Sequence, residues 1–487
     1  MASARPGPAF AEADRTGLVP RPHQETARDA ILAARREGRP GFLLGDATGL
    51  GKTLSVWAAV AALPEEEVLI VCPKGGMPQW RRTIALSGLA AKTVTLINYE
   101  RTKSLFRAPP ASTKRSARAK NNEIARHGTP KRTWPIVVFD EAHRLRNPYA
   151  QQSMACRQVA DRATFAIYMS ATAGQSPHEL SYLGRLLGHA ARCPTETLAD
   201  YRTLMKSLGI GRAKGRWTNW RWEPNERDRR VMSGLLYRGP EAIGMRRLPA
   251  DIVGWPEVQR ELAATALAPD ERRLYEATWR EFRREFGLLG GSTRRPAGWA
   301  ADLRFRQKAS LLRVVGTAAF AEDLLASGEQ VAISVAYLET GAMLREALEG
   351  RWRVGEINGE GSADVNEAAR VAFQTGEIDV VIFTVSESIS LHRGELPGGD
   401  KPRSLIVHDM RHSAIQLGQI EGRCHRDGER AVIYYAFAED TVEERIAATV
   451  VGRMAAMDGM AGDDTAMANA IGRAIAEAAE GRSAGSR

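Results

Sequence analysis

A glycine-rich loop joins an apolar run to a helical pattern in Gly41-Phe42-Leu43-Leu44-Gly45-Asp46-Ala47-Thr48-Gly49-Leu50-Gly51-Lys52-Thr53. Gly49 and Gly51 free the backbone, so that its N–H groups can surround phosphates at a helix N-terminus. The loop meets the G-x-x-x-x-G-K-[ST] template only loosely, but its strand–loop–helix context is the one that the motif requires. Lys52 is expected to reach the β- and γ-phosphates, and the Thr53 hydroxyl to hold Mg²⁺. The stretch therefore predicts a nucleoside triphosphate site.

A second apolar run, 136–139, ends in two carboxylates, Asp140 and Glu141. The carboxyl ends of parallel strands meet at one edge of a sheet, so this pair is expected beside the phosphate loop. There Asp140 would bind Mg²⁺ through water, and Glu141 would orient or deprotonate the attacking water. An acidic pair at a strand end is common by itself, but after a phosphate loop it favours hydrolysis of the bound nucleotide.

A third pattern, Q-x-x-G-R-x-x-R, is formed by Gln419, Arg423 and Arg426. Two arginines three residues apart are expected on one helical face. An arginine brought from elsewhere in the chain can stabilise the charge that develops on the γ-phosphate. The pattern alone also fits a surface helix, but it lies in a second α/β segment, which favours a catalytic role for the three residues.

The 487 residues alternate apolar, strand-like runs with helical patterns in two separate stretches. This predicts an α/β protein with two parallel-sheet lobes and a helical, Trp- and Arg-rich connection. The predicted strands are 41–44, 68–72, 93–97, 136–139 and 164–168, then 330–335, 353–357, 380–383, 404–407 and 431–435. The predicted parts are a flexible N-terminus 1–17, a first lobe 18–192, a connecting region 193–300, a second lobe 301–452 and a small helix with a tail, 453–487.

The positive charge is concentrated in the first half of the chain. The net charge is +10, and it divides into +19 for residues 1–250 and −9 for residues 251–487. Two stretches carry most of the excess: a basic insert at 101–132 and a stretch at 202–230 that contains Trp217, Trp220 and Trp222. This asymmetry indicates a polyanionic partner. A solvated loop is the alternative for the insert, and a small packed hairpin is the alternative for the tryptophans.

Other features of the sequence argue against several classes of protein. The four cysteines have no C-x-x-C spacing, which disfavours structural zinc and a disulfide framework; they are Cys72, Cys156, Cys193 and Cys424. No apolar run reaches the ~18 residues of a membrane span. The first ten residues lack the apolar core of a secretory signal. A soluble, cytoplasmic protein without a membrane partner is expected.

Together the three motifs resemble those of superfamily 2 helicase-type ATPases with a DEAH box, and within them the Swi/Snf-like branch. The resemblance covers roughly residues 18–450. It is also carried by Leu18–Gln24, Val71–Lys74 with Gln79 and Trp80, Ile97–Glu100, Asp140–Asn147, Ser170–Thr172, Met245–Arg247 and Thr441–Ile446. The resemblance implies two RecA-like lobes with ATP and Mg²⁺ bound between them. Gln24 would then read the adenine edge, and Arg423 and Arg426 would come from the second lobe.

By this resemblance, the expected activity is DNA-stimulated ATP hydrolysis with translocation on mainly double-stranded DNA. Two segments depart from the family pattern: Thr384–Leu391 has serines where glycines are usual, and Ala173-Gly174 stands where many relatives have proline. Two alternatives stay open, a strand-separating replication or recombination helicase and an ATP-gated nucleic-acid-binding scaffold without motor activity. The lack of room for chromatin-contact segments and the strong bias toward arginine over lysine suggest a bacterial or phage source.

Overall fold

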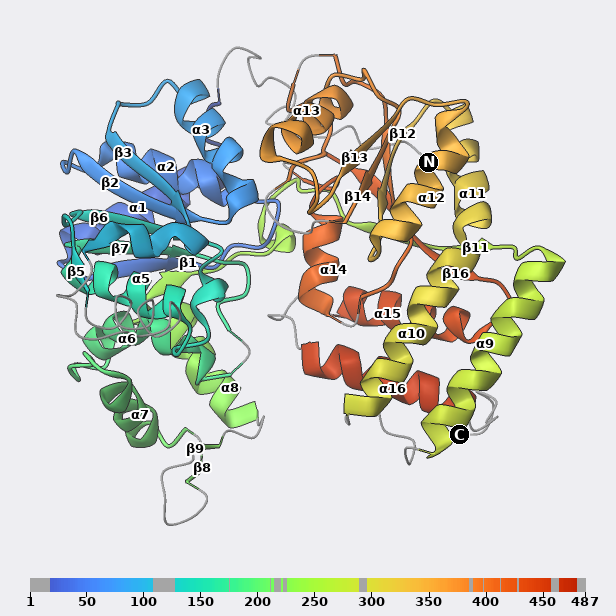
Figure 1. The fold of residues 1–487 in the computed structure, drawn as a ribbon. Helices are drawn as coiled ribbons and strands as arrows, with labels where there is room; N and C mark the ends of the chain where they lie inside the picture. The colour runs from blue at the N-terminus through green and yellow to red at the C-terminus, as the bar shows by residue number, and fades with distance from the viewer. Residues whose placement is uncertain are drawn as a thin grey trace. The chain divides into compact units, whose positions relative to one another are not determined.

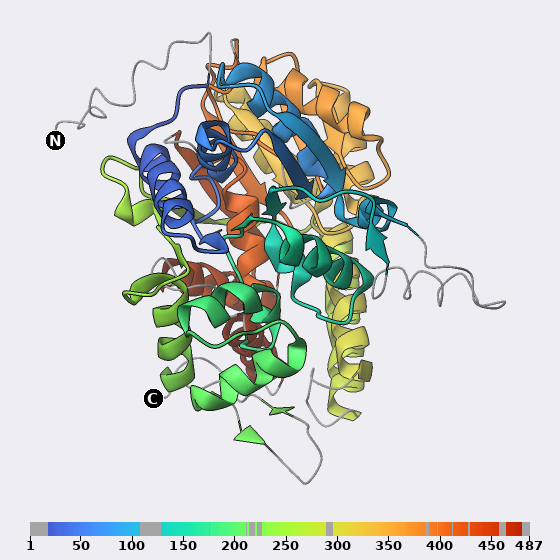
Figure 2. The ribbon, with the colours of Figure 1, turned by 90° about the vertical axis from the view of Figure 1, so that its left-hand side faces the viewer.

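The computed structural model describes residues 18–107, 128–174, 176–210, 212–213, 220–221, 226–288, 296–384, 389–396, 398–411, 413–426, 429–456 and 464–479. The chain divides into two compact units, Met1–Val253 and Gly254–Arg487. The first unit is coloured from blue to green and the second from yellow-green to red in Figure 1 and Figure 2.

Six parallel strands form the sheet of the first unit, in the order β10-β1-β7-β6-β2-β3. Five were predicted from the sequence: β1 Gly41–Leu44, β2 Glu67–Cys72, β3 Thr93–Asn98, β6 Ile136–Asp140 and β7 Phe165–Met169. The sixth, β10 Gly244–Met245, lies in the stretch that was predicted to be helical. Two residues are too short to show a strand pattern, which explains why β10 was missed.

Both faces of this sheet are covered by helices. Successive residues of a strand point to opposite faces, so Leu44 of β1 packs with α1 Pro22–Arg36 and α2 Lys52–Ala62. Leu43 packs on the other side with α5 Gln151–Arg162 and α6 Gly184–Ala190. Burial on both faces makes the strands apolar throughout, and this property allowed their prediction.

The remaining elements of the first unit are short. They are η2 Lys74–Gly76, α3 Met77–Leu86, η3 Tyr99–Leu105, β4 Phe106–Arg107, β5 Thr129–Pro130, η4 Ala142–Leu145, η5 Glu179–Leu183, α7 Leu198–Ser207, β8 Arg212–Ala213, β9 Trp220–Arg221, α8 Glu226–Ser233, the π-helical turn η6 Gly234–Arg238 and η7 Pro249–Asp251. β4 pairs antiparallel with β5 and closes the basic insert at its base. β8 pairs antiparallel with β9, so Trp220 lies in a two-stranded ribbon.

The second unit is built on another sheet of six parallel strands, in the order β11-β16-β15-β12-β14-β13. The predicted strands are β12 Gln330–Ser334, β13 Val354–Ile357, β14 Val380–Phe383, β15 Arg403–Val407 and β16 Ala431–Ala438. The edge strand β11 Gln259–Thr265 was not predicted. Its charged residues Arg260 and Glu261 and its position at the edge give it a weak strand signal. The helices are α9 Pro269–Leu288, α10 Pro296–Leu312, α11 Val314–Ala326, α12 Leu338–Glu349, α13 Ala363–Gln374, α14 Ala414–Glu421, α15 Val442–Ala456 and α16 Asp464–Ala479.

The second sheet is also covered on both faces. One core cluster joins β12 and β14 to α11 and α12, and the other joins the opposite faces of the strands to α14, α15 and α16. Met467, Ile471 and Ile475 of α16 are buried in this second cluster, so the predicted C-terminal helix belongs to the core of the unit. Within the described ranges, no helix is long and apolar enough to cross a membrane.

Candidate nucleotide-binding site

The phosphate loop, the acidic pair and Ser170 follow three neighbouring strands of the first unit. β1 pairs with β7, and β7 pairs with β6. Met169 lies opposite Leu44 on one side and Asp140 on the other. The three segments therefore leave the sheet at the same level and meet at its carboxyl edge, which is where α/β sheets bind ligands.

The phosphate loop has the backbone conformation that its glycines make possible. Gly49 and Gly51 have φ angles of 94° and 74°, a region in which residues with a Cβ are strained. Gly51 precedes α2, which begins at Lys52, so the first N–H groups of the helix face the loop. Lys52 Nζ donates to the carbonyl oxygens of Asp46 at 2.8 Å and Ala47 at 3.2 Å. The lysine thus lies across the loop.

Gln24 lies against the phosphate loop. Its amide nitrogen donates to the Leu50 carbonyl at 3.4 Å, and its Oε1 accepts from the backbone N–H of Arg21 at 2.9 Å. His23 Nε2 is 3.1 Å from the same Leu50 carbonyl. The start of α1 is therefore attached to the loop, and Gln24 is 3% exposed in this conformation. The contact of Gln24 with the adenine edge remains a prediction from the sequence.

Asp140 is a buried carboxylate with a perturbed pKa. One oxygen accepts from the Trp80 indole at 2.9 Å, and the other accepts from the backbone N–H of Glu141 at 3.0 Å. Burial, with the neighbouring Glu141 charge, raises the pKa of Asp140 to about 6, although the Trp80 hydrogen bond and the Lys52 charge act in the opposite direction. A cation at this carboxylate would relieve the cost of burying its charge.

Glu141 connects the acidic pair to the segment after β7. It has a left-handed backbone, with φ 50°, which is uncommon for a residue with a side chain and typical of functional sites. Glu141 Oε2 lies 3.2 Å from His143 Nδ1, and the same nitrogen lies 3.2 Å from Ser170 Oγ. Ser170 Oγ in turn donates to the Thr172 carbonyl at 2.9 Å. The acidic pair and Ser170–Thr172 therefore form one polar chain.

The predicted Mg²⁺ ligands fit a cation that is also held by a nucleotide. Thr53 Oγ1 and the Asp140 carboxylate both lie at the carboxyl edge of the sheet, and Gln79 lies 3.5 Å from the Thr53 hydroxyl. In the part of the chain that the structure describes, no three His, Cys, Asp or Glu side chains gather into a metal site. Mg²⁺ commonly binds one or two protein oxygens together with phosphates and water, so Thr53 and Asp140 suit it.

The predicted arginines of the second unit do not lie on a helical face. α14 ends at Glu421, Arg423 follows in a turn, and Arg426 forms an isolated antiparallel bridge with Glu429. Both guanidinium groups nevertheless donate to one carbonyl, that of Ile389, at 2.9 Å and 3.4 Å. The two arginines are thus brought together by a shared acceptor. Gln419 is 5% exposed near the end of α14.

Two contacts of the site were missed at the sequence level. In the sequence, Trp80 and Arg247 stand only within motif segments, yet Trp80 donates a hydrogen bond to Asp140, and Arg247 pairs with the buried Asp46 of the phosphate loop. Neither pairing has a local sequence signal, because the partners lie 60 and 201 residues apart.

Several predicted features fall outside the described residues. They are the N-terminus 1–17, the insert residues 108–127, Trp217, Trp222, residues 385–388 of the serine-containing segment, and residues 457–463 and 480–487 of the C-terminal part. For that segment, Ile389 to Leu391 are described, and the side chain of Arg403 donates to the Leu391 carbonyl at 2.6 Å. Ser390 Oγ lies 2.7 Å from His392 Nδ1.

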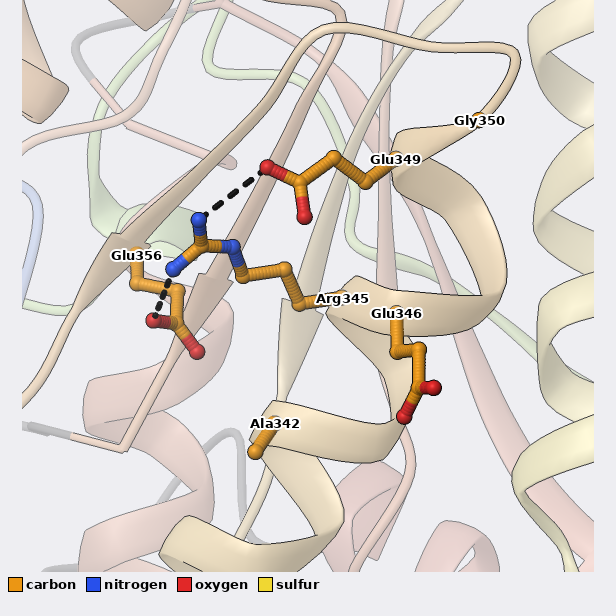
Figure 3. Close-up of a pocket in the computed structure, with 6 residues that line it drawn as sticks. All are labelled: Ala342, Arg345, Glu346, Glu349, Gly350 and Glu356. Atoms are coloured by element: carbon orange, nitrogen blue, oxygen red, sulfur yellow. Dashed lines mark hydrogen bonds and ion pairs between the residues drawn. The ribbon is translucent and has the colours of Figure 1, made fainter.

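A hollow in the second unit is separate from the motif residues. Its volume is about 510 Å³, and it is lined by Ala342, Arg345, Glu346, Glu349, Gly350 and Glu356 (Figure 3). Arg345 pairs with Glu349 at 3.0 Å and with Glu356 at 3.4 Å. The surplus of carboxylates disfavours a nucleotide or nucleic acid here, since both carry negative charge.

Comparisons with known proteins agree with the motifs of the first unit. Residues 17–175 match the family described as "Type III restriction enzyme, res subunit". "Protein CHROMATIN REMODELING 24" of Arabidopsis thaliana is 25% identical over 160 residues, which are 28% of this chain and 14% of that protein. "DNA excision repair protein ERCC-6" of Mus musculus is 27% identical over 143 residues, 24% of this chain and 9% of that protein.

Two solved structures from Sulfolobus solfataricus align along nearly the whole chain. The SWI2/SNF2 ATPase core in complex with dsDNA has 16% identity and a TM-score of 0.37, with 97% of each chain covered. The SWI2/SNF2 ATPase core domain has 16% identity and a TM-score of 0.35, with 94% of each covered. Because both TM-scores are low, we assign the fold of each unit from its own strand order and pairing.

The sequence matches and the motif geometry of the first unit agree with the resemblance of the motifs to superfamily 2 helicase-type ATPases. The chain spans only 14% and 9% of the length of the two curated relatives.

Proposed function

We propose that this protein hydrolyses ATP with Mg²⁺ and uses the energy to move along, or remodel, mainly double-stranded DNA. The observation that carries the proposal is the polar chain from Glu141 through His143 to Ser170, at the sheet edge that also holds the phosphate loop. ATP hydrolysis requires an activated water. Coupling of hydrolysis to movement requires that the group which activates this water also contact another segment of the chain, and Glu141 does so through His143 and Ser170.

Each site residue of the first unit has a proposed role. The glycine loop and Lys52 hold the phosphates, and Lys52 exchanges its two carbonyl partners for phosphate oxygens. Thr53 and Asp140 hold Mg²⁺, which neutralises charge on the phosphates when it is bound. Glu141 orients the attacking water, with its carboxylate held by His143.

The second unit is proposed to complete the site with Gln419, Arg423 and Arg426. Arg423 and Arg426 share the Ile389 carbonyl as an acceptor, and they are proposed to stabilise the charge that develops on the γ-phosphate. The two parallel-sheet units correspond to the two proposed RecA-like lobes. DNA as partner, the cytoplasmic location and the bacterial or phage source belong to the same proposal.

The test is the steady-state ATPase rate of the full chain without nucleic acid and with duplex DNA, single-stranded DNA or RNA. Duplex DNA is expected to stimulate most. Lys52→Ala should abolish hydrolysis and leave DNA binding intact, whereas Lys401→Ala, which removes an exposed lysine of the second unit, should keep the wild-type rate. Displacement of a third strand from a triplex then measures translocation directly.

Each result decides between functions. Preference for single strands, with unwinding of a fork, would favour the strand-separating helicase. DNA binding without stimulated hydrolysis would favour the ATP-gated scaffold. Equal turnover by Lys52→Ala and the wild type would overturn the nucleotide site itself.

A further inference from the structure

The chain segment that follows η6 runs beside the phosphate loop. Its pairing with β1 continues beyond the end of that strand and into the loop. The three backbone hydrogen bonds are Leu43 N–H to Ile243 O at 3.0 Å, Gly45 N–H to Met245 O at 2.8 Å and Ala47 N–H to Arg247 O at 2.9 Å. The first part of the loop is therefore held as an extension of the sheet.

This approach requires a glycine on the paired strand. A Cβ at Gly244 would lie 1.9 Å from the Leu43 carbonyl oxygen, which is far inside van der Waals contact. On the same side, Tyr237 covers Gly45, because a Cβ at Gly45 would lie 2.5 Å from the tyrosine hydroxyl. The segment from Tyr237 to Arg247 is thus fitted closely to the back of the loop.

Arg247 adds a charged contact to this backbone pairing. Its backbone N–H donates to Asp46 Oδ1 at 2.9 Å, its Nε donates to the same oxygen at 3.2 Å, and its Nη2 donates to Oδ2. Its Nη1 donates to the carbonyl of His23 in α1. The Asp46 carboxylate has no exposed surface, so removal of the guanidinium would leave a buried charge poorly compensated.

The same two loop residues are the resting partners of Lys52. Lys52 Nζ donates to the carbonyls of Asp46 and Ala47. Arg247 holds the Asp46 side chain and, through its own carbonyl, the Ala47 N–H. The Asp46 carbonyl and the Ala47 N–H belong to the same peptide plane, so they turn together. Holding the Ala47 N–H therefore also fixes the carbonyl to which Lys52 donates.

We propose that Arg247 is a positioning residue of the nucleotide site. It holds Asp46 and Ala47 in the orientation that binds the phosphates of a nucleoside triphosphate, and it ties the loop to the last part of the first unit, which ends at Val253. The inference rests on the proposed function in one respect, that the loop binds a nucleotide. It does not depend on hydrolysis, DNA or movement.

The test is a titration of the full chain with a fluorescent ATP analogue and Mg²⁺, together with the melting temperature of the ligand-free protein. Arg247→Met is expected to raise the Kd by about tenfold or more, and Asp46→Asn should raise it similarly. The double variant should bind no more weakly than Arg247→Met alone, because the two side chains act as one unit.

Arg35→Met is the matched control. Arg35 donates to Glu65 at 3.0 Å through Nε, and this pair also joins α1 to another part of the first unit. The variant should lower the melting temperature and leave the Kd unchanged. If Arg247→Met behaves in the same way, Arg247 is only a structural contact and the proposal is overturned.

If Arg247→Met does not fold, the Kd of Arg247→Lys for the ATP analogue is measured in its place. Lysine retains the charge but cannot make the forked contact, so a Kd several-fold above that of the wild type is expected, and an unchanged Kd overturns the proposal. A wild type that binds the analogue but is not stimulated by DNA contradicts the proposed function alone. A wild type that binds no analogue contradicts both.

Discussion

The Trp80 indole nitrogen donates a 2.9 Å hydrogen bond to Asp140 Oδ2, and this bond favours the ionised form of a buried carboxylate. Trp80 lies on α3 and Asp140 ends β6, so a helix 60 residues upstream contributes to the electrostatics of the acidic pair. Hydrolysis with Mg²⁺ requires the ionised form.

Trp80→Phe is therefore expected to move the acid limb of the pH profile of kcat/KM upward. Loss of one hydrogen bond to a charged group, about 1.5 kcal/mol or more, corresponds to a shift of about one pH unit. Trp57→Phe is the matched control, because it removes a 3.0 Å indole bond to Ser87 elsewhere in the same unit. Superimposable profiles for Trp80→Phe and the wild type would contradict the role of this bond.

Asp140→Asn is expected to stabilise the ligand-free protein while abolishing Mg²⁺-dependent hydrolysis. The pKa of Asp140 is raised from its ordinary value to about 6, so the folded state holds the proton more tightly than the unfolded state. Stability is then lost as the pH rises from about 4 to 6, on the order of 3 kcal/mol, and the variant avoids this loss.

Calorimetry in EDTA at pH 7.5 and pH 4 measures whether Asp140→Asn stabilises or destabilises the ligand-free protein. The melting temperature of Asp140→Asn should exceed that of the wild type by a few degrees at pH 7.5 and by much less at pH 4. Asp379→Asn should have the opposite effect at pH 7.5, because Arg353 holds the pKa of Asp379 below its ordinary value. A lower melting temperature for Asp140→Asn at pH 7.5 would refute the prediction.

The central strands and the phosphate loop could be predicted because their signals are local. A strand buried on both faces is a continuous apolar run, and Gly49 and Gly51 mark the loop by residue type. β10 and β11 could not be found in this way. β10 is held by its backbone bonds to β1, and β11 is a partly exposed edge strand, so neither needs an apolar run.

The site was predicted as a set of residues, but not as a network. The sequence pattern gives Asp140 and Glu141, whereas their contacts with Trp80 and His143 depend on how the strands are ordered. The helical face predicted for Arg423 and Arg426 was wrong because α14 ends at Glu421, before both residues. A three-residue spacing indicates one face only if the helix continues through both residues.

Ser170→Ala is expected to lower kcat and leave ATP affinity near the wild-type value. The change removes the hydroxyl that links His143 to the Thr172 carbonyl, and none of these groups belongs to the phosphate loop. The reduction should be about tenfold and larger in the presence of DNA. Ser153→Ala, at a buried position on α5, is the control and should be neutral. A raised Kd for ATP with unchanged kcat would refute the coupling role.

Arg426→Ala is expected to reduce kcat by about a thousandfold, as for other arginines that stabilise the transferring phosphoryl group. ATP affinity should change little, because in its proposed role this arginine acts on charge that develops in the transition state. Arg430→Ala removes a nearby exposed arginine and should leave kcat unchanged. If Arg426→Ala keeps the wild-type kcat, its contact with Ile389 is structural.

Replacing residues 108–127 with a short Asn-Gly turn is expected to weaken DNA binding without weakening the ATPase site. β4 and β5 pair antiparallel at the base of the insert, with Arg107 opposite Thr129, so a tight turn can close the gap. The excised stretch contains Lys114, Arg115, Arg118, Lys120 and Arg126.

If these basic side chains bind phosphates, the replacement should reduce the slope of log K against log salt by about 0.9 for each duplex phosphate that they neutralise. Titrations with duplex DNA at several salt concentrations measure this slope, and the basal ATPase rate serves as the internal control. A slope equal to that of the wild type would mean that the insert is a solvated loop and that other basic residues hold the DNA.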